Sequence, residues 1–291
     1  MDRRDQAVEE GLVVGGLPGV VVGEKTVFGA VPPEMPTNIA RGELSAVVRP
    51  DRVLASGMVN RSQRPLDGTL VPELPFEAGE ADWLLEAIPS IWEYRARRSD
   101  ATLVLPLMPP EFILEVLRDV IGWVRIASVH DGEFQLLRRT TIARAAPGAL
   151  AEFRNALWRH HVPRDRRIVL VSHRRDPFDA ESRSLLRRAV IRAGGVAVDI
   201  EWGAQVVRSA LEDAATVLVA EGLPHTVLLA PPGCRLVSMA HNHDDVLGRA
   251  EGTGLVVDRL ALAPIESDSH AESHLLDVTM ASDFIEAAST T

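Results

Sequence analysis

Residues 168–172, Ile-Val-Leu-Val-Ser, form a short apolar run typical of a strand that is buried on both faces of a sheet. A helix is expected after it, because Asp179 can cap a helix start and the Gly194-Gly195 pair can end one. Further strands are expected at 196–200, 216–220 and 234–239, with helices at about 204–214 and 225–229. Strand alternating with helix four times predicts a parallel sheet with helices on both faces.

The loops that follow these strands are where a ligand is expected. In open parallel sheets, ligands bind beyond the carboxyl ends of the strands. The candidate loops are therefore 172–176, 201–205 and 221–226.

The first of these loops reads Ser172-His173-Arg174-Arg175-Asp176. Two adjacent guanidinium groups can hold a diphosphate with forked hydrogen bonds. The alternative is a solvated, charged loop in a chain whose basic residues are nearly all arginine.

The third loop leads into a short helix and contains Glu221, Gly222, His225 and Thr226. Glycine permits close approach of the backbone to a ligand, and a helix start offers backbone amides to an anion. The G-x-G-x-x-G pattern of dinucleotide-binding loops is absent from the sequence. The alternative is an ordinary loop in which the threonine caps the helix.

A third group of polar residues, His241, His243 and Asp245, follows the last expected strand. It partly matches the H-x-H-x-D-H run with which binuclear hydrolases bind zinc. However, Val246 occupies the position of the final histidine, and the N-terminal β-sandwich that accompanies that run is not expected here. A polar surface loop is the competing interpretation, and the sequence predicts no metal site.

The N-terminal half gives weaker signals. Residues 1–75 are rich in glycine, proline and valine, which predicts short strands and turns without a long helix. A helix is expected over 82–94 and another from Pro109-Pro110, with strands at 101–105, 123–127 and 134–141. The sequence therefore predicts two α/β domains, 1–160 and 161–291, joined near 151–164.

Composition excludes several classes of protein. The 291 residues carry a formal charge of −10, which disfavours a general nucleic-acid binder. The single cysteine, Cys234, rules out an internal disulfide framework. The apolar run 11–23 follows acidic residues where a signal peptide needs positive charge, and no stretch has the length of a membrane span. A cytoplasmic protein without an integral membrane segment is expected.

Several short elements occur in a fixed order along the chain. Trp83-Leu84-Leu85-Glu86 lies on the first expected helix, and the later elements are Val171-Ser172-His173-Arg174-Arg175, Gly194-Gly195-Val196, Ile200-Glu201, Gln205 and Ala230-Pro231-Pro232-Gly233. This series resembles glycosyltransferase family 61, which includes bacterial polysaccharide-synthesis proteins, plant xylan transferases and animal O-GlcNAc transferases. The resemblance covers about residues 79–233, and 275–288 are similar to the closing strand and helix of the family.

The resemblance implies two Rossmann-like domains that face each other across a cleft, an arrangement like that of GT-B enzymes. The first domain would hold a carbohydrate or small-molecule acceptor, and the second would hold a nucleotide-sugar donor, a co-substrate rather than a resident cofactor. The enzyme would transfer a hexosyl or pentosyl group to a hydroxyl. Whether the chain forms a homo-oligomer is left open by the sequence. The implied donor-binding residues are Ser172, His173, Arg174, Arg175, Gln205, Gly222, His225 and Thr226.

The chain departs from the family at both of its histidines. Asp82 stands at the helix histidine, with Gly79 at the preceding asparagine, and Ala220 or Glu221 stands at the loop histidine. Asp82 or Glu221 would then be the catalytic base, or activity would be lost. Besides a glycosyltransferase, the sequence leaves open a non-catalytic binding or partner subunit and a metal-dependent hydrolase. In the non-catalytic case, Asp82 would only cap its helix.

Overall fold

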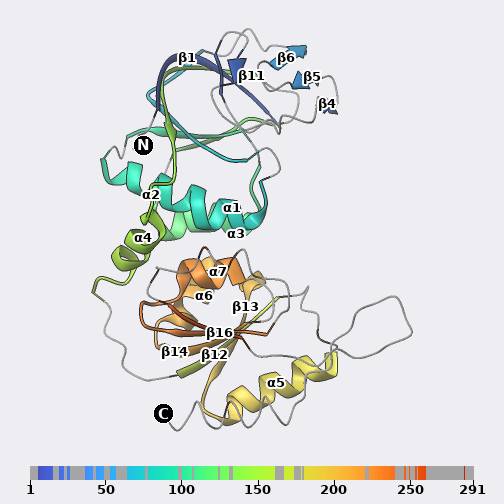
Figure 1. Ribbon diagram of the computed structural model, residues 1–291, viewed down its shortest axis with the longest axis vertical. Helices are drawn as coiled ribbons and strands as arrows, with labels where there is room; N and C mark the ends of the chain where they lie inside the picture. Colours follow the sequence, from blue (N-terminus) through green and yellow to red (C-terminus); the bar gives the residue numbers. More distant parts are fainter. Residues whose placement is uncertain are drawn as a thin grey trace. The chain divides into compact units, whose positions relative to one another are not determined.

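The computed structural model describes residues 6–15, 20–22, 25–26, 37–41, 44–48, 53–56, 64–75, 78–97, 100–106, 108–123, 125–130, 134–160, 167–173, 178, 180–219, 223–239, 246, 249, 253, 255–259 and 285. The chain is mixed α/β and divides into two compact units, Met1–Ala149 and Leu150–Thr291 (Figure 1). The division falls at the start of a helix just before the expected joining segment at 151–164.

The C-terminal unit contains a parallel sheet of five strands in the order β13-β12-β14-β15-β16. The second strand in the chain therefore lies on one side of the first, and the remaining strands lie on the other side. The parallel pairing of β12 with β13, expected from the sequence, is confirmed. The strands are β12 (Arg167–Ser172), β13 (Val196–Asp199), β14 (Ala214–Val219), β15 (Arg235–Ser238) and β16 (Val256–Arg259).

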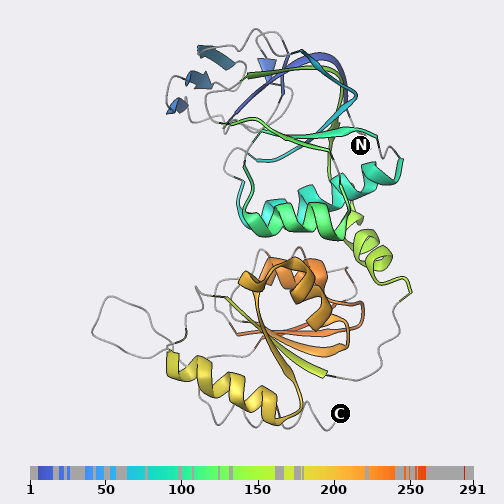
Figure 2. The same cartoon turned by 180° about the vertical axis from the view of Figure 1, so that it is seen from behind.

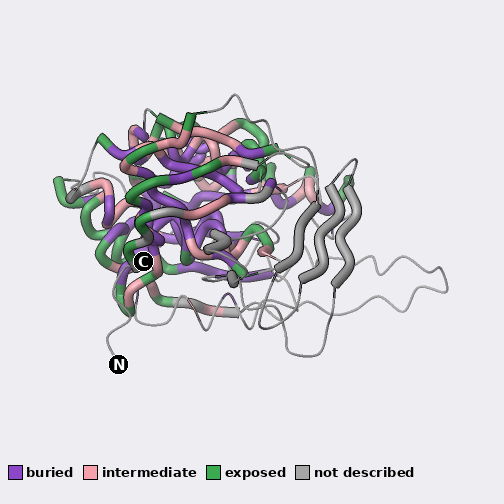
Figure 3. The backbone as a smooth tube through the Cα atoms, turned by 90° about the horizontal axis from the view of Figure 1, so that it is seen from above, coloured by how far each residue is buried: buried purple, intermediate pink, exposed green. Residues whose placement is uncertain are grey.

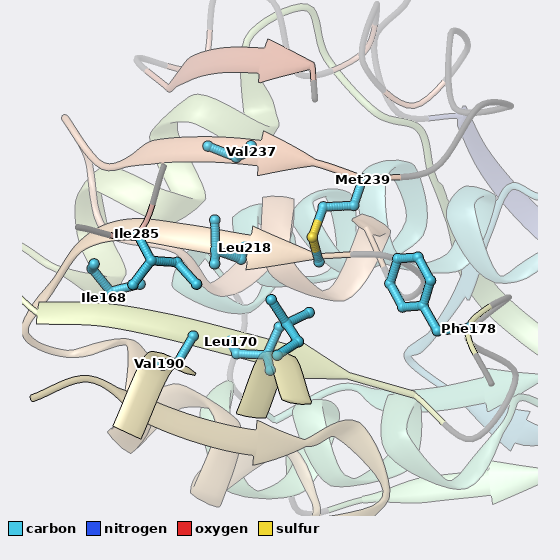
Figure 4. Packing of buried hydrophobic residues seen from close by; sticks show 9 residues of the cluster. Ile168, Leu170, Phe178, Val190, Leu218, Val237, Met239 and Ile285 are labelled. Atoms are coloured by element: carbon cyan, nitrogen blue, oxygen red, sulfur yellow. The ribbon is translucent and has the colours of Figure 1, made fainter. Parts of the chain in front are cut away.

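Helices cover both faces of this sheet, as Figures 1 and 2 show from opposite sides. One face carries α5 (Ala180–Arg192), and the other carries α6 (Ala204–Leu211) and α7 (Leu223–Leu229). On the α5 face, alternate strand residues pack with the helix in one apolar cluster (Figure 4). The cluster includes Ile168, Leu170, Phe178, Leu186, Val190, Leu218, Val237, Met239 and Ile285.

The glycine pair after α5 has the role that the sequence predicted. Gly194 has a φ of +76°, the left-handed conformation that commonly ends a helix. At Gly195, a Cβ atom would lie 2.5 Å from the carbonyl oxygen of Ile168, so only glycine allows the chain to pass β12 this closely.

A buried arginine holds the other helical side of this unit together. Arg154, on α4 (Ala149–Leu157), is 0% exposed. Its guanidinium donates to the carbonyl oxygens of Ala230 (2.8 and 3.2 Å), Pro231 (3.3 Å) and Thr253 (2.5 Å). The carbonyls that follow α7 have no partners within the helix, and a cation is favourable at this end of the helix dipole. Burial lowers the pKa of Arg154 to about 10, so it stays charged at neutral pH.

The N-terminal unit is built mainly on a mixed sheet in the order β10-β9-β8-β11-β1-β2-β3, with β7 also paired to β11. Strands β10, β9, β8 and β11 are parallel, and β1 is antiparallel to β11. A second sheet has the order β4-β5-β6. The bounds are β1 (Gln6–Val14), β2 (Val20–Val22), β3 (Lys25–Thr26), β4 (Thr37–Arg41), β5 (Leu44–Val48), β6 (Val53–Ser56), β7 (Leu66–Asp67), β8 (Thr69–Pro72), β9 (Thr102–Leu105), β10 (Ile126–Ser128) and β11 (Phe134–Ala143).

The helices of this unit connect its parallel strands. One continuous helix is formed by α1 (Glu80–Asp82), the wider turn η1 (Trp83–Ala87) and α2 (Ile88–Arg97). In η1 the amide of Ile88 bonds to the carbonyl of Trp83, five residues back, directly before Pro89. A widened turn relieves the clash that a proline causes inside a regular α-helix. The other helix comprises α3 (Glu111–Glu115) and η2 (Val116–Val120).

The sequence expectations for this half agree with the structure in kind and differ in detail. Within the described residues, only strands precede residue 80, as expected. The strand expected at 123–127 begins later, at Ile126, and the strand expected at 134–141 extends to Ala143. Figure 3 shows exposed residues recurring along the helices. None of the described helices has both the length and the apolarity needed to cross a bilayer.

Candidate functional site

The strand order of the C-terminal unit identifies the carboxyl ends of its strands as the candidate site. The chain leaves β12 toward β13 on one side and later returns to β14 on the other. At such a switch point the connections at the carboxyl ends diverge, and ligands bind there. Ser172 and His173 stand at the carboxyl end of β12, and Asp199 is paired beside Ser172 at the end of β13.

Polar side chains from the two strand ends meet at this edge. Nε2 of His173 lies 3.6 Å from Oε1 of Glu201, and these side chains are 17% and 34% exposed. The amide of Glu201 donates to Oδ1 of Asp199 at 3.3 Å. Asp199 thereby caps the short helix η3 (Ile200–Trp202), and this turn places Glu201 beside His173. The result is a partly exposed cluster of Ser172, His173, Asp199 and Glu201, which we call the strand-end cluster.

Asp199 holds its proton more strongly than an ordinary carboxyl group. Its pKa is raised to about 6, first by burial, which disfavours the charged form, and then by a hydrogen bond with the Glu201 side chain. The positive charge of Arg187 acts in the opposite direction. Asp199 therefore keeps its proton into the mildly acidic range, where it can donate to a ligand as well as accept from one.

This raised pKa predicts a pH dependence of stability. Because the folded state binds the proton more tightly than the unfolded state, Asp199 stabilises the fold below its ordinary pKa, 3.8. That contribution is lost as the pH rises through about 6. Between pH 4 and pH 7, the wild type should lose about 1 kcal/mol more unfolding free energy than Asp199→Asn, since partial solvation weakens the effect. Urea denaturation at both pH values measures this difference, and equal losses in both proteins would contradict it.

An aromatic residue borders the strand-end cluster. Trp202 directly follows Glu201 and is the last residue of η3. Its side chain is 51% exposed. The guanidinium carbon of Arg187, on α5, lies over the indole ring at 5.4 Å from its centroid. The tryptophan is therefore held by a cation while much of its surface stays accessible.

The structure distributes the predicted donor-binding residues unevenly. Ser172 and His173 belong to the strand-end cluster, and Gln205 lies exposed in the first turn of α6. His225 and Thr226 lie on α7 with 1% and 0% exposure, so neither side chain is displayed to solvent. Their contact with a donor stays a prediction. Arg174, Arg175, Gly222 and the catalytic candidate Glu221 lie outside the described residues.

Asp82 has a structural role at the start of its helix. Helix capping was the alternative to a catalytic role in the prediction from the sequence. The helix begins at Glu80, two residues before the expected start. Oδ2 of Asp82 accepts a hydrogen bond of 2.8 Å from the amide of Gly79, which precedes the helix. The carboxylate thus satisfies an amide at the helix start from inside the first turn, and not from the capping position itself. This interaction alone accounts for an aspartate at position 82.

The residues of the alternative hydrolase hypothesis, His241, His243 and Asp245, also lie outside the described residues. Across the parts of the chain that are described, no group of three or more His, Cys, Asp or Glu side chains could hold a metal ion. Burial raises the pKa of the Cys234 thiol to about 12, which makes it a poor nucleophile.

The N-terminal unit has an open, charged surface depression of about 710 Å³, lined by Glu9, Asp67, Arg138 and Arg139. Arg139 has a φ of +48° within β11, and its guanidinium forms a two-point ion pair with Asp67. The ion pair lowers the pKa of Asp67 and raises that of Arg139. Since the two arginines are balanced by two carboxylates, this depression is a weaker candidate for an anionic ligand than the strand-end cluster.

Asp199, Arg187 and Trp202 were not predicted from the sequence to have a role. A signal for two of them was present, because the stretch Asp199-Ile200-Glu201-Trp202 places two acids and a tryptophan around the end of a predicted strand. The position of Arg187 beside them depends on the packing of α5 and cannot be read from spacing. Compared with models of known protein families and with curated proteins, the chain matches none.

Proposed function

We propose that this chain is a glycosyltransferase whose C-terminal unit binds a nucleotide-sugar donor. The observation that carries the proposal is the strand-end cluster, Ser172, His173, Asp199 and Glu201, beside the switch point between β12 and β14 of a doubly wound parallel sheet. The ordered resemblance of residues 79–233 to glycosyltransferase family 61 supports the same function.

The positions of the carboxyl groups fit the ribose of a nucleotide. In dinucleotide-binding sheets, whose second strand also lies beside the first, an acidic residue after the second strand accepts hydrogen bonds from the ribose hydroxyls. Asp199 and Glu201 follow β13, the second strand of the unit. The hydroxyl of Ser172 and the imidazole of His173 add donors at the end of the first strand, where the phosphates lie in such complexes.

The diphosphate would be bound by groups that the sequence supplies next to this cluster. Arg174 and Arg175 directly follow His173 in the chain. Guanidinium groups form charge-assisted, two-point hydrogen bonds with phosphates, and each such contact contributes about 1.5–3 kcal/mol. In this proposal the N-terminal unit holds the acceptor, and the two units act as facing domains.

The proposed reaction requires one base. The acceptor hydroxyl oxygen forms a bond to the anomeric carbon of the sugar, and the bond from that carbon to the diphosphate oxygen breaks. The nucleoside diphosphate leaves with the electron pair, and the base takes the hydroxyl proton. We assign this role to Glu221, because the Asp82 carboxylate accepts the Gly79 amide and has a structural reason to be present.

Binding of nucleoside diphosphates tests the proposal most directly. In calorimetric titrations with UDP, GDP and ADP, at least one should bind the wild type. Glu201→Gln should weaken that binding roughly tenfold or more, because it removes a charged acceptor from the ribose. Glu212→Gln is the matched control, since Glu212 is an exposed acid at the C-terminal end of α6, before the amino end of β14.

Four outcomes would count against the proposal or a part of it. If no nucleoside diphosphate binds, the donor site is wrong. If Arg174→Ala and Arg175→Ala both leave the affinity unchanged, the diphosphate is not held there. If the wild type binds nucleotide sugar but transfers it to no acceptor, the non-catalytic subunit replaces the enzyme. Stabilisation by divalent metal alone, with hydrolytic activity, would favour the hydrolase.

A further inference from the structure

We propose that Trp202 is the surface on which the nucleobase of the donor stacks. This inference rests on the proposed donor site and adds to it the residue that recognises the base. It is drawn from the exposure of the tryptophan, the way in which it is held, and the residues beside it.

Trp202 is the most exposed of the described tryptophans. Those at positions 83, 123 and 158 are 2–6% exposed and Trp92 is partly buried, whereas Trp202 is 51% exposed. Indole rings bury large apolar areas in folded proteins, and an isolated exposed ring at a ligand-binding edge provides a flat face for another ring. Val206, in the first turn of α6, is also 44% exposed.

The ring is held in place before any ligand arrives. The guanidinium of Arg187 lies over it at 5.4 Å, and the charge of Arg187 also acts on Asp199. The backbone of Trp202 is fixed on one side by the cap from Asp199 and on the other by Gly203, whose φ is +97°. A pre-positioned ring loses little conformational entropy on binding, so stacking contributes more to affinity.

The residues beside Trp202 indicate which kind of ligand would stack on its indole ring. Glu201 directly precedes it, and Asp199 lies in the same turn. In the proposed complex these carboxyls hold the ribose hydroxyls. The base is attached directly to the ribose, so it would come within reach of the indole ring. The positive charge of Arg187 is shared between Asp199 and the indole. The cluster therefore combines acceptors for a diol with a flat apolar face, which fits a ribonucleoside.

Stacking on an aromatic side chain contributes about 1–3 kcal/mol per base and depends little on base identity. Trp202→Ala should therefore weaken binding of the best nucleoside diphosphate on the order of tenfold to a hundredfold. Trp202→Phe, which keeps a flat ring, should restore most of the affinity. Ribose 5-phosphate, which has no base, should bind the wild type and Trp202→Ala equally.

The matched control is Val256→Ala. Val256 is 57% exposed on β16, at the opposite edge of the same sheet, and its replacement should leave nucleotide affinity unchanged. All proteins are compared by calorimetry after their thermal midpoints are shown to agree within a few degrees. Because Trp202 is half exposed, its replacement should not unfold the chain.

The results separate this inference from the proposed function. If the wild type binds nucleoside diphosphates and Trp202→Ala binds them equally well, the stacking inference is wrong and the donor site stands. If Trp202→Ala loses affinity for free monosaccharides and not for nucleotides, the ring that stacks is a sugar, and the inference is again overturned. If the wild type binds no nucleotide, both are wrong.

Discussion

Replacing Arg154 by leucine should lower the free energy of unfolding of the C-terminal unit by about 3–5 kcal/mol. The guanidinium is fully buried and donates four hydrogen bonds to the carbonyl oxygens of Ala230, Pro231 and Thr253. Leucine fills much of the volume but donates nothing, so three carbonyls lose this donor, including those just after α7. Urea denaturation monitored by circular dichroism measures the change, and hydrogen exchange of amides in β14 and β15 assigns it to this unit.

Two further variants separate the hydrogen bonds from the charge. Arg154→Lys keeps a cation but lacks the planar fork that spans three carbonyls, so it should fall between leucine and the wild type. Arg188→Ala removes an exposed arginine that bonds only within α5 among its described contacts, to Ser184, and should change stability by about 0.5 kcal/mol or less. Equal denaturation midpoints for Arg154→Leu and the wild type would show that Arg154 does not hold α4 to the end of α7.

The parallel sheet of the C-terminal unit was predictable because its strands carry local signals. Uninterrupted apolar runs such as Ile168–Val171 have no polar face, so they require cover on both sides. The glycine pair at 194–195 marks the end of α5 through backbone conformation, which a sequence shows directly. The role of Arg154 gives no such signal. An arginine on a helix is ordinarily exposed, and its burial depends on carbonyl groups about 76–99 residues later in the chain.

The sequence predicted the location of the candidate site better than the residues that form it. The rule for parallel sheets identified the loops after β12 and β13, and His173 and Glu201 indeed meet there. The expected contribution of Thr226 depended on treating the start of α7 as an open turn, whereas the helix begins at Leu223 and buries both His225 and Thr226. A hydrophobic sequence cannot reveal which face of so short a helix is covered. Asp199 was missed because its raised pKa depends first on burial and then on a hydrogen bond with Glu201, and the sequence shows neither.

The assignment of the base makes the second large prediction. Glu221→Gln should lower the transfer rate by on the order of 10²–10⁴, because glutamine cannot take the acceptor proton. In sequence, Glu221 lies between the end of β14 and the start of α7, and β14 borders the switch point beside which the strand-end cluster is located. Nucleotide affinity should change little, since the base acts on the acceptor. The measurement is single-turnover transfer from the nucleotide sugar that binds best.

Asp82→Asn is the matched control for that experiment. Asparagine keeps a side-chain oxygen that can accept the Gly79 amide, so both the helix start and the transfer rate should be nearly preserved. Asp82→Ala removes the acceptor and should cost about 1 kcal/mol of stability with the transfer rate unchanged. If Asp82→Asn instead slows transfer a hundredfold while Glu221→Gln does not, the base is on the first helix, and the bond to Gly79 orients a catalytic group. If the wild type transfers sugar and neither variant slows the transfer, the proton is taken by a residue other than these two carboxylates.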